Sequence, residues 1–119
     1  MKKILSILLV SVLLIGCSKD RVLIDELTNK GTEESPIMYS EKGLFNGIGF
    51  DVYKDGQLKF ENNYTDGNID GLWKEWYKNG QLSYEGNYKD GWEDGLQKNW
   101  FENGQLISES NYTNGVKID

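Results

Sequence analysis

The strongest constraint on this chain is an internal repeat with a period of 24 residues, which occupies residues 47–119. Its three units span residues 47–70, 71–94 and 95–119. Each unit repeats an opening glycine, an aromatic residue, a turn glycine, a glutamate, an asparagine and a tyrosine: Gly47, Gly71 and Gly95; Tyr53, Tyr77 and Phe101; Gly56, Gly80 and Gly104; Glu61, Glu85 and Glu109; Asn63, Asn87 and Asn111; Tyr64, Tyr88 and Tyr112. Gly43 matches Gly67 one period earlier, so we expect a degenerate unit before the first. Such self-similarity indicates stacked supersecondary units.

Two turn signals alternate within each unit and leave room only for short strands. Both signals are Asp-Gly or Asn-Gly pairs, which tolerate positive φ and are typical of tight hairpins. The alternating pairs begin at residues 55, 66, 79, 90, 103 and 114. Successive turn glycines are 11 or 13 residues apart, a spacing that fits strands of about 5–7 residues. Each unit is therefore predicted to be one β-hairpin, and the units together an antiparallel meander of at least six strands.

The residue pattern within the hairpins predicts two different faces. On the second strand of the middle unit, Leu82, Tyr84 and Tyr88 share one face by strict alternation. The first strand carries Trp73 and Trp76 on opposite faces. We therefore expect a packed, structural face under Leu82, Tyr84 and Tyr88, and an accessible aromatic strip elsewhere. Stacking should also align equivalent side chains in rows, Tyr64 with Tyr88 and Tyr112, and Tyr53 with Tyr77 and Phe101.

The segment from Tyr84 to Gly91, followed by Gly95, resembles the MORN repeat. That family has the pattern Tyr-x-Gly-x-Trp/Tyr-x-x-Gly, a further glycine four residues on, and a turn glycine that closes the unit. The Asn-Gly-Gln-Leu turn at residues 103–106 is similar to the variant repeats of bacterial YwqK-family antitoxins. This resemblance implies an all-β fold, an open single-layer antiparallel sheet used as a binding or spacing surface.

The resemblance covers residues 43–119, and it has three departures. Asn62 and Ser110 replace the glycine of the Tyr-x-Gly step, and Gln97 replaces an aromatic residue. These positions weaken the individual units without changing the period.

The first seventeen residues follow the plan of a bacterial lipoprotein signal. Lys2 and Lys3 precede an apolar run over 4–15, which is too short for a bilayer core that needs about 20 residues. The end of the segment, Leu-Ile-Gly-Cys at 14–17, resembles the lipobox, in which the cysteine is acylated and becomes the new N-terminus. We expect a helical signal peptide at residues 1–16 and a lipid on Cys17. The alternative is a plain signal peptide followed by a free cysteine.

The remaining chain divides into a lipidated tether over 17–35 and the repeat sheet over 36–119. The tether is charged and contains turn-forming residues, so we expect it to be mostly irregular. Residues 22–24 are the exception and are compatible with a short helix or an added strand. Ser18 follows the cysteine where an aspartate would resemble an inner-membrane retention signal, so the expected location is the cell envelope, at the outer membrane if the host has one.

Composition excludes several classes of function. Removing residues 1–16 with their two lysines leaves 103 residues and changes the net charge from −6 to −8, which disfavours nucleic acid and anionic lipid headgroups as partners. Membrane contact is therefore expected through the lipid on Cys17 alone. The sequence has no histidine, and Cys17 is its single cysteine, which removes the usual nucleophile–base pairs and zinc sites. We expect no enzymatic activity, no cofactor and no metal.

Two sets of side chains are candidates for a site. The row of Glu61, Glu85 and Glu109 is compatible with a cation site, but a solvated face balanced by lysines is the favoured interpretation. Trp73 and Trp92 each occur in only one unit, so repeat packing does not require them. With Tyr77 they form the predicted binding patch. We expect a protein partner, a toxin or another envelope protein; the alternative is a carbohydrate or cell-wall ligand. The oligomeric state stays open.

Overall fold

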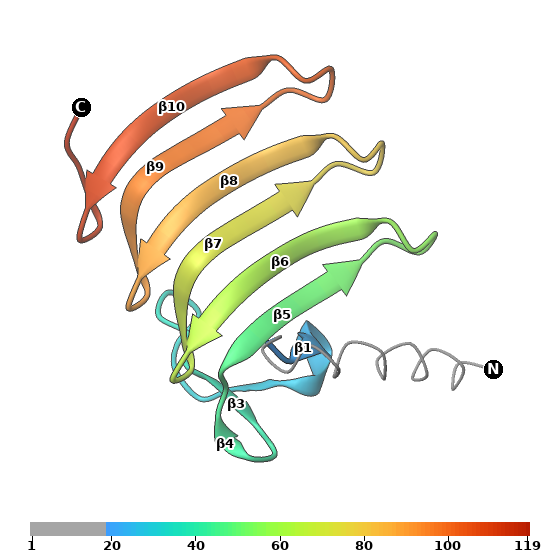
Figure 1. Ribbon diagram of the computed structural model, residues 1–119, viewed down its shortest axis with the longest axis vertical. Helices are drawn as coiled ribbons and strands as arrows, with labels where there is room; N and C mark the ends of the chain where they lie inside the picture. The colour runs from blue at the N-terminus through green and yellow to red at the C-terminus, as the bar shows by residue number, and fades with distance from the viewer. Residues whose placement is uncertain (1–18) are drawn as a thin grey trace.

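The computed structural model describes residues 19–119, which are almost entirely β-structure (Figure 1). One eight-stranded sheet dominates, and a three-stranded sheet lies at its N-terminal end. The predicted all-β meander is therefore confirmed. The predicted signal peptide at 1–16, its predicted helix over 4–15 and the predicted lipid on Cys17 all fall outside the described residues. Within residues 19–119, no helix combines the length and apolar character needed to cross a membrane.

The large sheet follows chain order, so that each hairpin packs beside the next in one curved layer (Figure 1). Its antiparallel strands are β5 (Gly47–Val52), β6 (Leu58–Thr65), β7 (Asn68–Trp76), β8 (Leu82–Lys89), β9 (Trp92–Trp100), β10 (Leu106–Thr113) and β11 (Val116–Lys117). At one edge, β1 (Arg21–Leu23) pairs with β5 in parallel. No helix occurs between residues 47 and 119.

The two alternating turn signals produce two different turns. At 66–67, 90–91 and 114–115 both residues have positive φ, for example 51° at Asp66 and 82° at Gly67, which is the geometry of a two-residue hairpin turn. At the opposite end of the sheet only the glycine has positive φ. There the Asp or Asn accepts a hydrogen bond instead, as Asp55 Oδ1 does from the Gln57 amide at 3.0 Å. Identical dipeptides are thus used once for backbone freedom and once for a side-chain acceptor.

The degenerate unit is present but interrupted. β3 (Met38–Ser40) and β4 (Gly43–Leu44) form a hairpin. Residues 44–52, one period before β7, run from the last residue of β4 to the end of β5. The strand breaks at Phe45 and Asn46, and the ring of Phe45 is only 3% exposed. Residues 45 and 46 therefore lie outside the strands, and this break places the ring of Phe45 in the core.

The added strand allowed at residues 22–24 is found as β1 (Arg21–Leu23). The prediction of an irregular tether over 17–35 is wrong for the residues that follow, because they form the 3-10 turn η2 (Ile24–Glu26) and β2 (Thr28–Asn29), which pairs with β3. Leu27 is buried, and Val22 and Ile24 pack against the same cluster. The segment docks because β5 offers an unpaired edge and the first hairpins offer an apolar face to cover.

The core lies between this N-terminal segment and one face of the first hairpins. We call this face the inner face; it carries Tyr64 and Trp73 on β6 and β7. The buried residues are Leu27, Met38, Phe45, Tyr64 and Ile69, with Val22, Ile24, Trp73 and Tyr88 packed around them. The core thus fills one end of the repeat sheet and leaves the other end of the inner face without a cover.

The opposite, outer face carries the predicted glutamate row, and positive side chains alternate with it. In register across the strands, Lys74 lies between Glu61 and Glu85, and Lys98 lies between Glu85 and Glu109. The Lys74–Glu85 and Lys98–Glu109 pairs are 3.8 and 3.7 Å apart, and Arg21 pairs with Glu61. These half-exposed pairs each contribute a few tenths of a kcal/mol at most. The expected solvated face balanced by lysines is confirmed.

Candidate binding groove

A single row of side chains crosses the inner face and contains all three departures from the MORN pattern, which are Asn62, Gln97 and Ser110. Six residues from six strands stand opposite one another in register: Gly49, Asn62, Trp73, Gly86, Gln97 and Ser110. In the repeat, Trp73 corresponds to Gly49 and Gln97, and Gly86 corresponds to Asn62 and Ser110. The inner face therefore changes character from strand to strand although its backbone repeats. The tryptophan is placed where this row borders the core.

Around Trp73 the side chains form one connected aromatic and polar cluster. The ring centroid of Trp73 is 6.0 Å from that of Tyr84, edge to face, and 5.3 Å from that of Tyr88. The two tyrosine hydroxyls are 3.0 Å apart, and the Tyr84 hydroxyl donates to Oε1 of the buried Gln97. The indole Nε1 donates to Glu75 Oε2 at 2.9 Å. These bonds fix the orientation of Trp73 and of both phenol rings.

Gly86 makes this arrangement possible. A Cβ placed on Gly86 would lie 2.2 Å from the Tyr84 hydroxyl and 2.1 Å from Gln97 Oε1. The absence of a side chain therefore lets Tyr84 fold back over its own strand and meet Gln97. Asn62, which replaces this glycine one unit earlier, donates instead to the Tyr64 hydroxyl at 3.3 Å, and its Oδ1 is buried without a partner.

The tyrosine hydroxyls titrate above their ordinary range. Burial raises the pKa of Tyr84, and the hydrogen bond with Tyr88 raises it further. Burial also raises the pKa of Tyr88, the charges of Glu93 and Glu75 add to this increase, and the bond with Tyr84 opposes it. Burial raises the pKa of Tyr64, against a smaller opposing effect of the Asn62 bond. The hydroxyls are therefore neutral and act as hydrogen-bonding groups at physiological pH.

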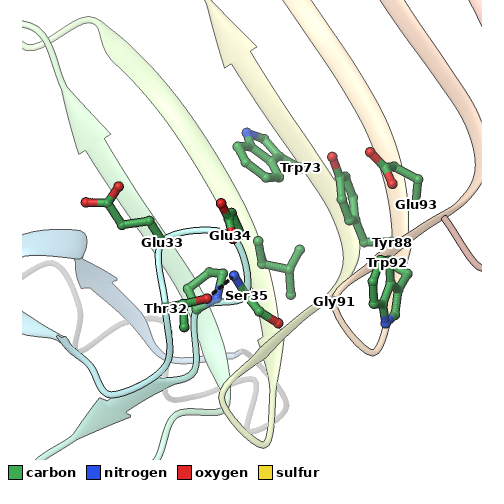
Figure 2. Close-up of a pocket in the computed structure, with 11 residues that line it drawn as sticks. Thr32, Glu33, Glu34, Ser35, Trp73, Tyr88, Gly91, Trp92 and Glu93 are labelled. Atoms are coloured by element: carbon green, nitrogen blue, oxygen red, sulfur yellow. Dashed lines mark hydrogen bonds between the residues drawn. The ribbon is translucent and has the colours of Figure 1, made fainter.

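A groove of about 530 Å³ lies between this cluster and the loop 32–36 (Figure 2). The lining residues come from the loop, from β7 and from the β8–β9 hairpin: Thr32, Glu33, Glu34, Ser35, Pro36, Ile69, Trp73, Tyr88, Gly91, Trp92 and Glu93. Figure 2 shows Trp73 and Tyr88 on one wall and the loop on the other, with Trp92 at the rim. The floor of the groove is Ile69, which belongs to the core.

The loop that forms the second wall is held by its own hydrogen bonds. Asn29 Oδ1 accepts from the amides of Gly31 and Ile37 at 2.8 and 3.0 Å, which closes the loop at its base. Thr32 Oγ1 accepts from the Ser35 amide at 2.9 Å near its tip. The wall is therefore a turn held by side-chain hydrogen bonds, and it includes Glu33 and Glu34.

The structure brings two of the three predicted binding residues together and separates the third. Trp73 and Trp92 line the same groove, and Trp92 is 60% exposed. Tyr77 lies at the opposite end of β7, where its hydroxyl donates to the Trp100 carbonyl at 2.7 Å. Tyr53 makes the same bond to Trp76 one unit earlier. Placing Tyr77 in the patch was wrong because its repeated role is to join one hairpin to the next.

A second correction concerns the two faces. Trp73 does not lie on a separate strip from Tyr84 and Tyr88; all three share the inner face, because Trp73 pairs with Gly86.

The groove also contains residues that the sequence did not indicate. Glu33 and Glu34 belong to the segment expected to be an irregular tether, and Tyr88 was assigned to packing alone. Only the docking of residues 21–29 brings these glutamates to the sheet.

Two segments of the chain, residues 69–90 and 93–114, match the family model described as MORN repeat variant. They coincide with the β7–β8 and β9–β10 hairpins, which carry most of the groove wall. Neither a curated protein nor a solved structure gives a significant match. The β7–β8 and β9–β10 hairpins of this sheet are thus two MORN repeat variants.

Proposed function

We propose that this chain is a non-catalytic, lipid-anchored protein of the cell envelope that binds a protein partner on the inner face of its repeat sheet. The observation that carries the proposal is the groove itself. Its rim residue Trp92 is 60% exposed, and the repeat does not require a tryptophan there. MORN repeats in general bind proteins or membranes. Large exposed aromatic side chains beside a concave surface are typical of protein-binding sites.

Protein is preferred over membrane as the ligand of the sheet because of charge. The chain without residues 1–16 carries a net charge of −8, from −6 and two lost lysines. Such a surface is repelled by anionic headgroups. Membrane attachment is assigned to acyl chains on Cys17, each buried CH₂ contributing about 0.8 kcal/mol. Replacing Cys17 with Ala should abolish labelling by radioactive palmitate and move the protein out of the membrane fraction. Retained labelling would contradict the anchor.

The resemblance to YwqK-family antitoxins suggests a more specific form of the proposal, in which the partner is a toxin and the protein acts as an immunity factor. This form is supported by the Asn-Gly-Gln-Leu turn, which occurs at residues 79–82 and 103–106. The first unit has the same turn with Asp55 in place of the asparagine. A gene for a toxin beside this one, and growth arrest on loss of this protein alone, would support that form.

Site-specific photo-crosslinking in cells tests which face binds. A photoreactive phenylalanine analogue in place of Trp92 reports on the groove, and the same analogue in place of Leu96, on the outer face of the same strand, is the matched control. We expect discrete protein adducts from position 92 and none from position 96. Equal adducts from both positions, or none from position 92, would contradict binding at the inner face.

A carbohydrate or cell-wall ligand is the second candidate, because an exposed tryptophan beside carboxylates is also suited to stacking on a sugar ring. Glu33, Glu34 and Glu93 supply hydrogen-bond acceptors along the groove that Trp92 borders. Sedimentation with purified peptidoglycan separates the candidates. Binding that needs Trp92, together with no protein adduct from position 92, would favour the carbohydrate.

A further inference from the structure

The walls of the groove combine aromatic faces with carboxylates. Trp73, Tyr88 and Trp92 provide the aromatic surface, and Glu33, Glu34 and Glu93 provide the charge. Among the described residues that line the groove there is no lysine or arginine. No ion pair within residues 19–119 engages these three glutamates. The groove therefore holds negative charge that residues 19–119 do not neutralise, unlike the outer face with its alternating lysines.

We infer that this groove accepts an arginine or lysine side chain from a basic, extended segment of a protein partner. The inference rests on the proposed function and specifies its chemistry. A guanidinium or ammonium group is attracted to the face of a tryptophan or tyrosine ring, by about 0.5–2 kcal/mol depending on exposure. Carboxylates at the same site add charge-assisted hydrogen bonds. A cation is the one type of side chain that both kinds of wall favour.

The chain already uses this pairing elsewhere. The Arg21 guanidinium carbon lies 4.7 Å from the Phe50 ring centroid, and Arg21 also pairs with Glu61. The Lys30 ammonium lies 4.4 Å from the Tyr39 ring centroid. In the Arg21 case one cation is held between an aromatic face and a carboxylate. The groove offers the same two partners around an open space.

Other occupants fit the groove less well. A second copy of this acidic chain would bring like charge to Glu33, Glu34 and Glu93, and an anionic membrane surface would do the same. A purely apolar segment would remove these carboxylates from water without giving them a partner, which is costly. A basic segment neutralises them and covers the exposed ring of Trp92.

Tryptophan fluorescence of the full-length protein in detergent micelles tests the inference, with two capped pentapeptides as probes. One alternates glycine and arginine, and the other replaces each arginine with citrulline, its neutral near-isostere. We expect saturable binding of the arginine peptide that is at least about tenfold tighter than that of the citrulline peptide. Raising the salt concentration from about 0.1 M to about 0.5 M should reduce this difference.

Variants locate the binding. The double replacement Glu33→Gln and Glu34→Gln should remove most of the preference for arginine, and Trp92→Ala should weaken binding of the arginine peptide. Glu102→Gln, an exposed acid at the opposite end of the sheet, is the control and should leave binding unchanged. Because Glu33 and Glu34 are exposed, their replacement should not unfold the protein, which circular dichroism would verify.

The outcomes separate this inference from the proposed function. Equal affinity for both peptides, no binding of either, or binding that survives the Glu33 and Glu34 changes would overturn the cation site. Crosslinks from position 92 would then still support a protein partner of different chemistry. Arginine-peptide binding without any protein adduct from position 92 in cells would support the cation site and count against the proposed function.

Discussion

The first and the last repeat unit have the same hairpin backbone, but the inner face of the first is covered by the core and that of the last is not. Tyr64 in the first unit is 4% exposed, tilts against Phe45 with ring centroids 5.7 Å apart, and belongs to the core. Tyr112, its equivalent two periods later, is only partly covered. The repeated residues therefore specify the sheet, whereas the residues that are not repeated decide where it has a core. The groove lies at the boundary between these two regions.

The boundary has a structural cause. The N-terminal segment covers the inner face of the first hairpins and turns back at the loop 32–36, beside Ile69 and Trp73. Beyond this loop the inner face becomes polar, with Gln97, Asn99 and Ser110 on β9 and β10. A repeat protein needs a polar surface where no further layer covers it. The groove is thus the edge of the covering layer, and its aromatic wall is the last part of the core.

Truncating the two equivalent tyrosines gives the largest contrast between the regions. Tyr64→Ala should lower the free energy of unfolding by about 3–5 kcal/mol, because it removes a buried ring and leaves a cavity. Tyr112→Ala should cost about 1 kcal/mol or less, because Tyr112 lies outside the core cluster and is less buried than Tyr64. Chemical denaturation followed by tryptophan fluorescence measures both. Similar losses for the two variants would show that the regions are equally packed.

Replacing equivalent residues of the inner-face row gives the next contrast. Gly86→Ala should destabilise the fold by about 1–3 kcal/mol, because its Cβ would displace the Tyr84 hydroxyl from Gln97. Ser110→Ala, at the same repeat position near the open end, should stay within about 0.5 kcal/mol. Thermal unfolding of the two variants compares them directly. A neutral Gly86 variant would mean that Tyr84 is free to move aside.

The buried tyrosines of the first two units should make the stability of the fold depend on pH. The unfolded chain loses tyrosine protons near pH 10.0, whereas burial raises the pKa of Tyr64, Tyr84 and Tyr88 in the folded state. Above about pH 10 the unfolded state therefore binds fewer protons than the folded state. The contribution of these tyrosines to the free energy of unfolding is fully present below about pH 10 and falls as the pH rises further. Thermal midpoints from about pH 8 to about pH 11 should show this decline. Tyr84→Phe should make the thermal midpoint fall less steeply with pH. An unchanged slope of midpoint against pH would contradict a raised pKa for Tyr84.

The sequence predicted the repeated part of the molecule because each unit carries its own strand and turn signals. It allowed an added strand at residues 22–24 but did not predict the docking of residues 25–29, which depends on contacts with Tyr64 and Ile69 far along the chain. Asp-Gly and Asn-Gly pairs were also ambiguous. The pair at 70–71 is not a turn but lies where β7 bulges against β6, and Asp70 Oδ1 accepts from the Asp90 amide at 3.3 Å.

The groove was only partly predictable for the same reason. Trp73 and Trp92 were identifiable because they break the repeat, and a residue that repeat packing does not require is free to serve another purpose. Tyr77 was misassigned because its hydroxyl acts on the next unit, which strand alternation does not show. Glu33 and Glu34 had no signal at all, since their position follows from the docked N-terminal segment.

The smallest expected effect on stability belongs to Trp92, and it separates the two groove tryptophans. Because repeat packing requires neither Trp73 nor Trp92, the sequence alone predicts that Trp73→Ala and Trp92→Ala leave the thermal midpoint nearly unchanged. The structure changes this expectation for Trp73, whose ring packs against Tyr84, Tyr88 and the core, so its truncation should cost about 1–3 kcal/mol.

Trp92 rests mainly on the turn glycine Gly115 and is largely exposed, so Trp92→Ala should change the free energy of unfolding by about 0.5 kcal/mol or less. Arginine-peptide binding in solution should nevertheless weaken. A midpoint for Trp92→Ala as low as that of Trp73→Ala would place Trp92 in the core, and the groove would then lose its exposed aromatic rim. The two tryptophans therefore test whether one end of the repeat sheet is stabilised by packing while its boundary is kept open for binding.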